Sequence, residues 1–433
     1  MFGVAIFAAV AFGYALVSRR LSTTLITGPI VFTLLGVFLG SNLLRGVNSE
    51  LDSGAVQLLL EVTLVVVLFS DAAATDVRRA RREASLPGRL LGIGMPLTIL
   101  SGTLAAFVFF DALGFWEAAV VAVVLAPTDA ALGKSIITNK SVPRVVRQAL
   151  NVESGLNDGI AVPFLAITIA GALGEMQTLS GVVSVFVGEI GWAILGGMLV
   201  GWIGGKAILF ASKRGWMSDR WRLIAALVLA IAAFAVASPL GGSGFLAAFV
   251  AGLTFGSIVR STYPDICEFS DDTAEFLTMT AFFVFGAFML VPSFPLITWS
   301  MVGFALVILT VARMIPVAIS MIGTRLKAPT VLYLGWFGPR GLASLVFVGT
   351  VVVEGNLLSD APMILAVVAT VVATSVVLHG VSAVPLSKAY GRWWARTEDA
   401  RRGMAESVEV RNMAYRHRIQ GSSDDTHPAG PQS

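Results

Sequence analysis

The sequence has little of the material from which soluble enzymes and metalloproteins are built. Its single cysteine, Cys267, excludes a disulfide framework and any metal site with several thiolate ligands. Its 3 histidines are too few for a histidine-built centre. Only 13% of the 433 residues are charged and 56% are hydrophobic, so polar side chains cannot cover the outside of a soluble protein. The composition therefore indicates a protein surrounded mostly by lipid.

Apolar stretches long enough to cross a bilayer recur along most of the chain. A transmembrane helix needs roughly 20 apolar residues. The sequence predicts an all-α polytopic membrane protein with about 13 transmembrane helices, at residues 1–18, 29–44, 54–75, 90–110, 116–137, 145–171, 181–211, 222–238, 244–259, 274–291, 297–322, 331–353 and 361–386. The first stretch lacks the basic start of a secretory signal and precedes Arg19 and Arg20, so we expect it to be retained.

Basic residues are unevenly divided between the two sets of connections. One set of alternate connections, together with the C-terminal segment, holds 27 of the 30 lysines and arginines, and the other set holds only Arg45. Because basic loops stay in the cytoplasm, this asymmetry predicts a cell (plasma or inner) membrane protein with its N-terminus outside and its C-terminus inside. The net charge of +3 is explained by this topology, and we expect no nucleic-acid partner.

Two helix-breaking sites occupy matching positions if the spans are divided as six, one and six. Pro127 interrupts span five, and Gly338-Pro339 interrupts span twelve, which would run in the opposite direction. A proline inside a helix removes a backbone hydrogen bond and clashes with the preceding turn. A simple kink would explain either site alone, but each has a charge beside it. The pattern predicts six-helix inverted repeats in which spans five and twelve are unwound and line a cavity.

Charged residues inside the predicted spans need a partner or a function. Each costs at least roughly 2.5–3.5 kcal/mol at the bilayer centre on insertion scales. Full pairing of the acids with the bases would leave carboxylates over, and an unpaired buried carboxylate takes a proton or binds a cation. Competition between these two ligands amounts to exchange. The residues concerned are Asp71, Asp129, Glu153, Asp158, Arg313 and Arg340.

Span six carries the most suggestive of these acids. Ser154 and Asp158 are four residues apart on one helix face and offer a hydroxyl and a carboxylate to a small cation. The neighbouring Asn157 is neutral, and no residue near Asp158 in the sequence supplies a positive charge. We therefore predict that Asp158 is the carboxylate that the cation and the proton share.

The other charges have more structural interpretations. Unwinding of span five would free the Thr128 carbonyl and expose a helix N-terminus for Asp129 to offset, while Arg340 would neutralise the opposite dipole in span twelve. Glu153 and Arg313 are expected to form a buried ion pair between the repeats. For Asp71, near the cytoplasmic end of span three, a functional acid and a solvated helix end are both open.

Together these segments resemble one family of transporters. The motifs Pro127-Thr128-Asp129, Glu153-Ser154-Gly155-Leu156-Asn157-Asp158, the lone Arg313 and Gly338-Pro339-Arg340-Gly341 are similar in order and spacing to those of NhaP-type sodium/proton antiporters of the monovalent cation:proton antiporter superfamily. The resemblance covers roughly residues 1–388. It implies a core of spans 4–6 and 11–13 (about 90–171 and 297–387) that moves against a dimerisation part of spans 1–3 and 7–10 (about 1–75 and 181–291). A cytoplasmic tail at 389–433, disordered in its distal part, would follow.

The same resemblance implies a set of ligands for a transported monovalent cation. Asp158 and Ser154 would ligate the ion, Thr128 would add an oxygen, and an acid of span three would complete the site. In related proteins the acid at this position of span three looks like a glutamate. This chain has Asp71 there, and because the aspartate side chain is shorter, direct contact between Asp71 and the ion is an open question. The Asn157-Asp158 pair resembles that of electroneutral members.

We therefore expect a homodimeric Na+/H+ antiporter working by alternating access, with no catalytic residue and no cofactor. A K+/H+ antiporter of the same fold is the alternative, and a cation channel is a rival from another class. A transporter of organic solutes is a weaker alternative, because few aromatic residues lie near the motifs and the polar residues there suit a bare cation better than a larger ligand. An intramembrane aspartyl protease built on Asp129 and Asp158 would resemble Tyr-Asp and Gly-x-Gly-Asp patterns, which are absent here.

Overall fold

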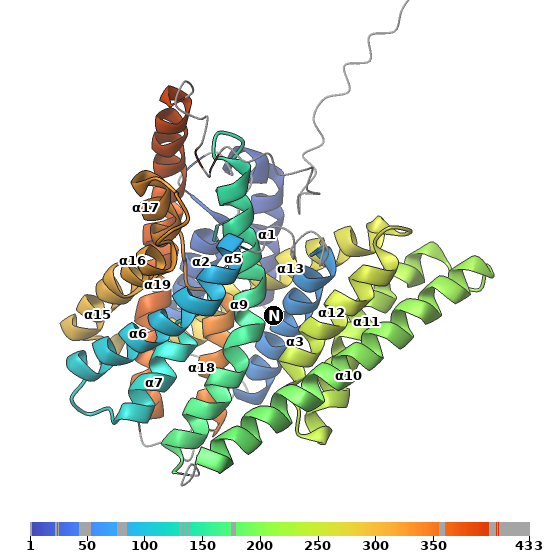
Figure 1. The fold of residues 1–433 in the computed structure, drawn as a ribbon, viewed down its shortest axis with the longest axis horizontal. Helices are drawn as coiled ribbons and strands as arrows, with labels where there is room; N and C mark the ends of the chain where they lie inside the picture. Colours follow the sequence, from blue (N-terminus) through green and yellow to red (C-terminus); the bar gives the residue numbers. More distant parts are fainter. Residues whose placement is uncertain are drawn as a thin grey trace, which may run out of the picture.

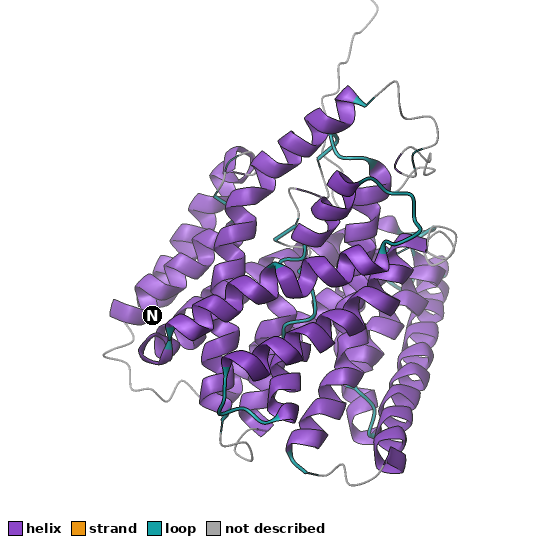
Figure 2. Ribbon diagram, turned by 60° about the vertical axis from the view of Figure 1, so that its left-hand side comes forward, coloured by secondary structure: helices purple, strands orange, loops and turns teal. Residues whose placement is uncertain are grey.

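The computed structural model describes residues 2–21, 24, 26–42, 53–75, 85–129, 132–133, 136, 139–174, 179–354, 360–397, 404 and 406. Within these ranges every regular element is a helix, and Figure 2 shows the helices joined by loops without a strand. Of the described helices, 8 are long and apolar enough to cross a membrane, and shorter apolar helices accompany them. The predicted all-α membrane class is confirmed, while the number of spans and the inverted repeat stay predictions.

The described helices follow the predicted stretches closely. The first are α1 (Phe2–Leu21), α2 (Gly28–Asn42), α3 (Ser53–Ala74), α5 (Ser85–Arg89), the π-helical η2 (Leu90–Gly94), α6 (Met95–Phe109), α7 (Phe115–Val124), α9 (Arg144–Ala172) and α10 (Leu179–Lys213). They are followed by α11 (Asp219–Ala237), η3 (Ser238–Leu240), α12 (Gly244–Val259), α13 (Pro264–Val284), the π-helical η4 (Phe285–Leu290), α14 (Val291–Ser293) and η5 (Phe294–Leu296). The last are α15 (Trp299–Leu309), α16 (Val311–Ser320), α17 (Ala328–Trp336), α18 (Leu342–Glu354) and α19 (Ala361–Arg396). Each predicted stretch overlaps at least one of these helices.

Two boundaries differ clearly from the predictions. Helix α13 begins at Pro264, well before the predicted start at 274. The prediction started late because the acid-rich first turns of this helix were interpreted as a connection. Helix α19 continues to Arg396, so the first residues of the predicted tail are helical. Both differences arise where polar helical turns continue an apolar span beyond the stretch that hydropathy can detect.

The helices pack in two groups that meet at α9 and where α18 lies against α3 and α19 lies against η4 and α2. In one group, α6 packs against α7, α15 and α16, while α17 packs against α16, and α18 and α15 pack against α19. In the other, α10 packs against α11 and α12, and α3 packs against α12 and α13, with α2 beside α13 and η4. Helix α9 contacts α7, α17 and α18 on one side and α3, α10 and α12 on the other. Figure 1 shows α9 between the two groups.

Glycines bring the backbone of α12 directly against α3. A Cβ added to Gly252 would lie 2.3 Å from the Phe69 carbonyl oxygen, and one added to Gly256 would lie 2.3 Å from that of Ala73. Helices in lipid gain most of their association energy from such close backbone packing. The helix that carries Asp71 is therefore fixed tightly against its neighbour.

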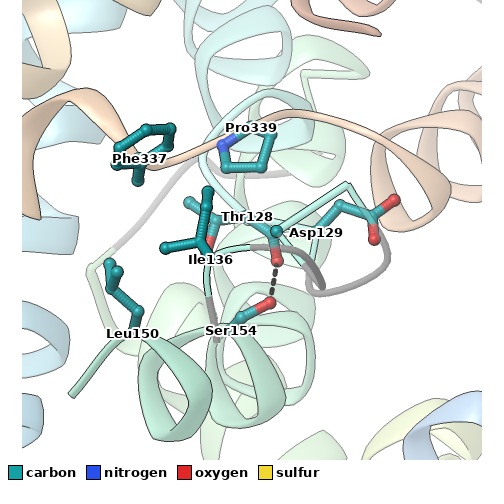
Figure 3. Close-up of a pocket in the computed structure, with 8 residues that line it drawn as sticks. Thr128, Asp129, Ile136, Leu150, Ser154, Phe337 and Pro339 are labelled. Atoms are coloured by element: carbon teal, nitrogen blue, oxygen red, sulfur yellow. Dashed lines mark hydrogen bonds between the residues drawn. The ribbon is translucent and has the colours of Figure 1, made fainter. Parts of the chain in front are cut away.

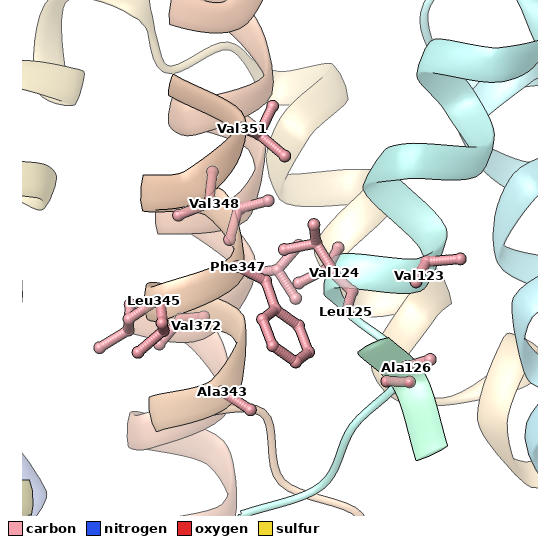
Figure 4. Packing of buried hydrophobic residues seen from close by; sticks show 14 of the residues in the cluster. Val123, Val124, Leu125, Ala126, Ala343, Leu345, Phe347, Val348, Val351 and Val372 are labelled. Carbon is pink, nitrogen blue, oxygen red and sulfur yellow. The ribbon is translucent and has the colours of Figure 1, made fainter. Parts of the chain in front are cut away.

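The two interrupted segments pack against each other through apolar side chains. Phe347 of α18 and its neighbours face the end of α7, around Leu125 and Ala126 (Figure 4). Phe347 and Leu125 are fully buried. Ser344 Oγ also donates a hydrogen bond of 2.7 Å to the Val124 carbonyl. The ends of the two helices at the breaks are thus held side by side.

Glu406, which lies beyond the end of α19 in the predicted tail, contacts the start of α17. Glu406 is 3% exposed, and its Oε1 accepts hydrogen bonds from the Lys327 backbone N–H at 2.8 Å and from Thr330 Oγ1 at 2.7 Å. Thr330 Oγ1 also lies 2.9 Å from the hydroxyl of Tyr390. Lys327 is the N-cap of α17. In a capping box, a carboxylate at the third helical position accepts a hydrogen bond from the N-cap backbone N–H, and here Glu406 of the tail is that acceptor.

Candidate cation site at the crossing of two broken helices

Both predicted breaks are present, and they lie against each other. Helix α7 ends at Val124, and the chain from there to residue 129 is not helical. Helix α17 ends at Trp336, and α18 starts only at Leu342. The Asp129 backbone N–H donates a hydrogen bond of 2.7 Å to the Pro339 carbonyl oxygen. We call these two segments, residues 125–129 and 337–341, the crossing.

The charges at the crossing serve the helices of the opposite segment. Asp129 Oδ2 accepts a hydrogen bond of 2.9 Å from the backbone N–H of Leu342, the first residue of α18. Arg340 Nη1 donates to the carbonyls of Ala126 and, at 3.0 Å, Pro127, just beyond the end of α7. The sequence placed the dipole that each charge offsets on its own span, whereas the contacts that the described residues show are with the other span. A negative charge meets a helix N-terminus and a positive charge meets a C-terminus, but across the crossing.

Glycine is required on both sides of Arg340 for this arrangement. A Cβ added to Gly341 would lie 1.8 Å from Asp129 Oδ2, where no atom can be accommodated. One added to Gly338 would lie 2.6 Å from Arg313 Nε. The Gly338-Pro339-Arg340-Gly341 motif thus combines two close approaches with one buried cation, and this explains its composition.

The predicted ligands of spans five and six meet at the crossing. Ser154 Oγ donates a hydrogen bond of 2.7 Å to the Thr128 carbonyl, and Asn157 Nδ2 donates one of 2.7 Å to Thr128 Oγ1. In Figure 3, Ser154 lies on one side of Thr128, Phe337 and Pro339 lie on the other, and the Asp129 carboxylate points away from Ser154. With its proton donated to Thr128, the Ser154 hydroxyl keeps lone pairs with which to contact a cation.

A small pocket lies at this point. Its cavity volume is about 10 Å³, which is near the minimum that holds one water molecule. The residues that line it are Thr128, Asp129, Gly133, Ile136, Leu150, Ser154, Phe337 and Pro339. Asp158 does not line the pocket, because it lies one helical turn beyond Ser154 on α9.

Asp158 is a buried carboxylate with little support from the protein. It is 7% exposed, and its Oδ1 has no hydrogen-bond partner among the described residues. The Oδ1 of the adjacent Asn157 is also buried without a partner there. Buried carboxylate oxygens normally accept hydrogen bonds or bind cations, so Asp158 has capacity for a ligand.

Glu153 and Arg313 form the predicted ion pair. Glu153 Oε1 lies 2.6 Å from Arg313 Nη1, and the side chains are 3% and 2% exposed. The pair joins α9 to α16. The remaining Glu153 Oε2 and the Arg313 Nε and Nη2 have no partner among the described residues, so each charge depends on the other.

Asp71 is an interior residue. It is 7% exposed on α3, which packs against α9, so the alternative of a solvated helix end was wrong. The preceding Ser70 donates a hydrogen bond to Asp271 of α13. Asp271 was missed because its acid-rich surroundings were assigned to a connection. The four arginines that follow span three in the sequence, Arg78, Arg79, Arg81 and Arg82, lie outside the described residues.

The geometry can now be compared with known proteins. The family described as "Sodium/hydrogen exchanger, transmembrane" matches residues 6–389. The chain belongs to the sodium/hydrogen exchanger family. The chain is 28% identical over 337 residues to a K(+)/H(+) antiporter, NhaP, of Alkalimonas amylolytica, covering 76% of this chain and 56% of that protein. It is 30% identical over 308 residues to a probable Na(+)/H(+) antiporter of Schizosaccharomyces pombe, covering 66% of this chain and 40% of that protein.

The chain spans about half the length of these curated relatives. Its fold is similar to that of the sodium proton antiporter MjNhaP1 from Methanocaldococcus jannaschii, with a TM-score of 0.76 at 19% identity, covering 89% of this chain and 99% of that one. A second structure of MjNhaP1 gives a TM-score of 0.65 at 21% identity, over 92% of this chain and 94% of that one. These likenesses support the fold.

The candidate site contains more hydroxyl and backbone oxygens than clustered acids. Within the described ranges no group of three or more histidine, cysteine, aspartate or glutamate side chains could hold a metal ion. The oxygens that the hydrogen bonds bring together at the crossing are those of Ser154 and Thr128, which are hard ligands.

Proposed function

We propose that this chain is a secondary active antiporter that exchanges one monovalent cation for one proton at Asp158. The observation that carries this proposal is the Asp158 carboxylate, buried with an unpartnered oxygen one turn from Ser154 at the crossing. The other five predicted membrane charges have contacts within the structure, and Glu153, whose second oxygen is also unpartnered among the described residues, is already paired with Arg313. Membership of the sodium/hydrogen exchanger family supports the same assignment.

The proposed chemistry is competition for one carboxylate. Deprotonated Asp158 binds a cation together with Ser154 and the oxygens of Thr128, and Asp71 of α3 completes the site. The group of helices that carries Asp158 then shifts, the cation leaves, and a proton neutralises Asp158 for the return. Because Asn157 is neutral and Glu153 is paired with Arg313, Asp158 is the one carboxylate of α9 whose charge changes during the cycle, while Asp71 keeps its charge throughout. One cation per proton, and hence electroneutral exchange, follows from this count.

The pocket supports a bare cation over an organic solute. A volume of about 10 Å³ admits nothing larger than a water molecule or a dehydrated ion. Leu150 precedes Ser154 on α9, and Phe337 follows the last turn of α17, two helices that we predict to start on the cytoplasmic side. We therefore propose that the pocket is a cytoplasmic approach to the site.

Sodium is the proposed substrate, and potassium is the alternative. The small volume favours the smaller ion, whereas the Alkalimonas relative is named as a K(+)/H(+) antiporter and the Schizosaccharomyces relative as a probable Na(+)/H(+) antiporter. Selectivity between them depends on cavity size and ligand flexibility. A series of lithium, sodium and potassium in proteoliposomes distinguishes the two proposals.

The proposal extends to the arrangement of the protein in its membrane. We propose a homodimer in the cell membrane, with the N-terminus outside and the C-terminus in the cytoplasm, as the charge asymmetry predicts. The packing in two groups that meet at α9 is consistent with one part that moves and one that remains fixed. No cofactor is part of this mechanism.

The decisive experiment replaces the proposed shared carboxylate. Asp158→Asn keeps the shape of the side chain but cannot give up a proton, so we expect a folded protein without cation-driven proton movement. The measurement is dequenching of a pH-sensitive dye in proteoliposomes after addition of sodium or potassium. Asp219→Asn is a matched control, because Asp219 is 87% exposed and lies outside the site.

Two results would refute the proposal. Exchange at the wild-type rate by Asp158→Asn would exclude that residue as the shared carboxylate. A cation current through the wild-type protein without proton movement would instead support the channel interpretation.

A further inference from the structure

A histidine on α19 bridges the two edges of the break in span twelve. His379 is 1% exposed, and its Nε2 lies 3.0 Å from the carbonyl oxygen of Trp336, the last residue of α17. Its Nδ1 lies 3.1 Å from Ser375 Oγ, one turn earlier on α19. Ser375 Oγ accepts a hydrogen bond of 2.7 Å from the Arg340 backbone N–H. The pair therefore connects a backbone group before the break to one after it.

These two backbone groups would be partners in an uninterrupted helix. A helical N–H donates to the carbonyl four residues earlier, so Arg340 N–H would donate to Trp336 O. Pro339 and the non-helical segment between α17 and α18 prevent that bond. The Trp336 carbonyl accepts a hydrogen bond of 2.9 Å from the Gly338 backbone N–H, and Ser375 with His379 links this carbonyl to the Arg340 N–H on the other edge of the break.

His379 Nδ1 lies 3.1 Å from both the hydroxyl and the carbonyl oxygen of Ser375, and a connection through the hydroxyl requires that Nδ1 accept. Arg340 N–H donates to Ser375 Oγ, and the Ser375 hydroxyl is then free to donate to His379 Nδ1. The imidazole proton lies on Nε2, which donates to Trp336 O. This chain satisfies both buried backbone groups with a neutral imidazole. The Trp336 indole also donates a bond of 3.0 Å to Ser382, so α17 is held to α19 at a second point.

We propose that Ser375 and His379 are positioning residues for cation exchange, because they hold the break in span twelve in the shape that aims Arg340 at the carbonyls of span five. This inference rests on the proposed function. The Arg340 backbone is fixed by Ser375, and its guanidinium contacts Ala126 and Pro127. Thr128, with the carbonyl that Ser154 contacts, comes next in the chain. A looser break would therefore shift the Arg340 contacts with Ala126 and Pro127, and with them the Thr128 carbonyl of the cation site.

The test compares a removal, a conservative replacement and a matched control. His379→Leu and Ser375→Ala each remove the bridge, whereas His379→Gln retains an amide N–H that can donate to Trp336 O. Thr370→Val is the control, because its buried hydroxyl donates only within α19, to Ala366 O. The first readout is the KM for sodium in proteoliposomes. The second is amide hydrogen exchange of peptides covering residues 337–342 in the purified protein.

We expect His379→Leu and Ser375→Ala to raise the sodium KM roughly tenfold, the equivalent of one lost hydrogen bond of about 1.4 kcal/mol. The double variant should resemble either single one, because both remove the same bridge. Hydrogen exchange in residues 337–342 should become faster in both, while His379→Gln and Thr370→Val stay within about twofold of wild type.

Other results would overturn the inference. A lower yield or maximal rate with an unchanged KM, and unchanged exchange at residues 337–342, would show that the pair merely supports packing of α19. Additive effects in the double variant would show that the two residues act separately. If the wild-type protein does not exchange cations, the proposed function fails, but hydrogen exchange at the break still decides whether the bridge exists.

Discussion

Loss of Glu153 and loss of Arg313 from their ion pair should destabilise the protein by different amounts. The paired atoms lie 2.6 Å apart, with both side chains almost fully buried. Glu153→Gln leaves a guanidinium that cannot lose its charge and whose Nε and Nη2 already lack described partners. We expect this variant to lose about 3–5 kcal/mol of stability, the usual cost of an uncompensated buried charge.

Removal of the other partner should cost less at low pH. Arg313→Met leaves a carboxylate that takes up a proton, so its destabilisation should shrink as the pH falls, whereas that of Glu153→Gln should not. The double variant Glu153→Gln/Arg313→Met leaves no charge and should lie within about 2 kcal/mol of wild type. The unfolding free energy in detergent, followed by tryptophan fluorescence at several pH values, measures all three variants. Additive losses in the double variant would refute the assignment of the pair as one unit.

Three further results are expected. Asp129→Ala should destabilise the protein by about 1–3 kcal/mol in detergent unfolding, because the Leu342 N–H loses its acceptor; Asp129→Asn, which keeps an oxygen there, should lose less, and equal losses would contradict the capping role. Glu406→Gln should lower the thermal midpoint slightly, and Glu406→Ala should lower it more, because the bonds from Lys327 and Thr330 are lost; a midpoint unchanged by tail removal would contradict this contact. Lowering the pH should raise the KM for the cation by up to about tenfold per pH unit, because one proton displaces one cation from Asp158; a KM independent of pH in proteoliposomes would exclude competition.

The features that the sequence predicted are those that depend on local physics. Apolar runs of the right length located the helices, because insertion in lipid depends on the hydrophobicity of each segment alone. Pro127 and Pro339 located the breaks for an equally local reason, the missing backbone donor. Glu153 and Arg313 were paired correctly by counting the few charges available in an apolar chain.

What the sequence could not show is which distant groups meet. Asp129 was assigned to its own span because the sequence gives neighbours along the chain and not neighbours in space. The actual acceptor–donor pair joins residues 213 positions apart. His379 was dismissed with the other histidines for the same reason, since its bond to Trp336 depends on how α19 packs against α17. Whether Asp71 ligates a cation stays a prediction.

The exchange of charges across the crossing has a consequence for biosynthesis. Asp129 and the Ala126 and Pro127 carbonyls find their partners only when residues 340–342 have been made, more than two hundred residues later. At about 5–20 residues per second, the ribosome needs roughly 10–40 s to deliver them. During that interval the nascent chain holds an unwound span with uncompensated polar groups, which the insertion machinery must shelter from lipid. Chains that stop short of Leu342 should be recognised as defective and degraded.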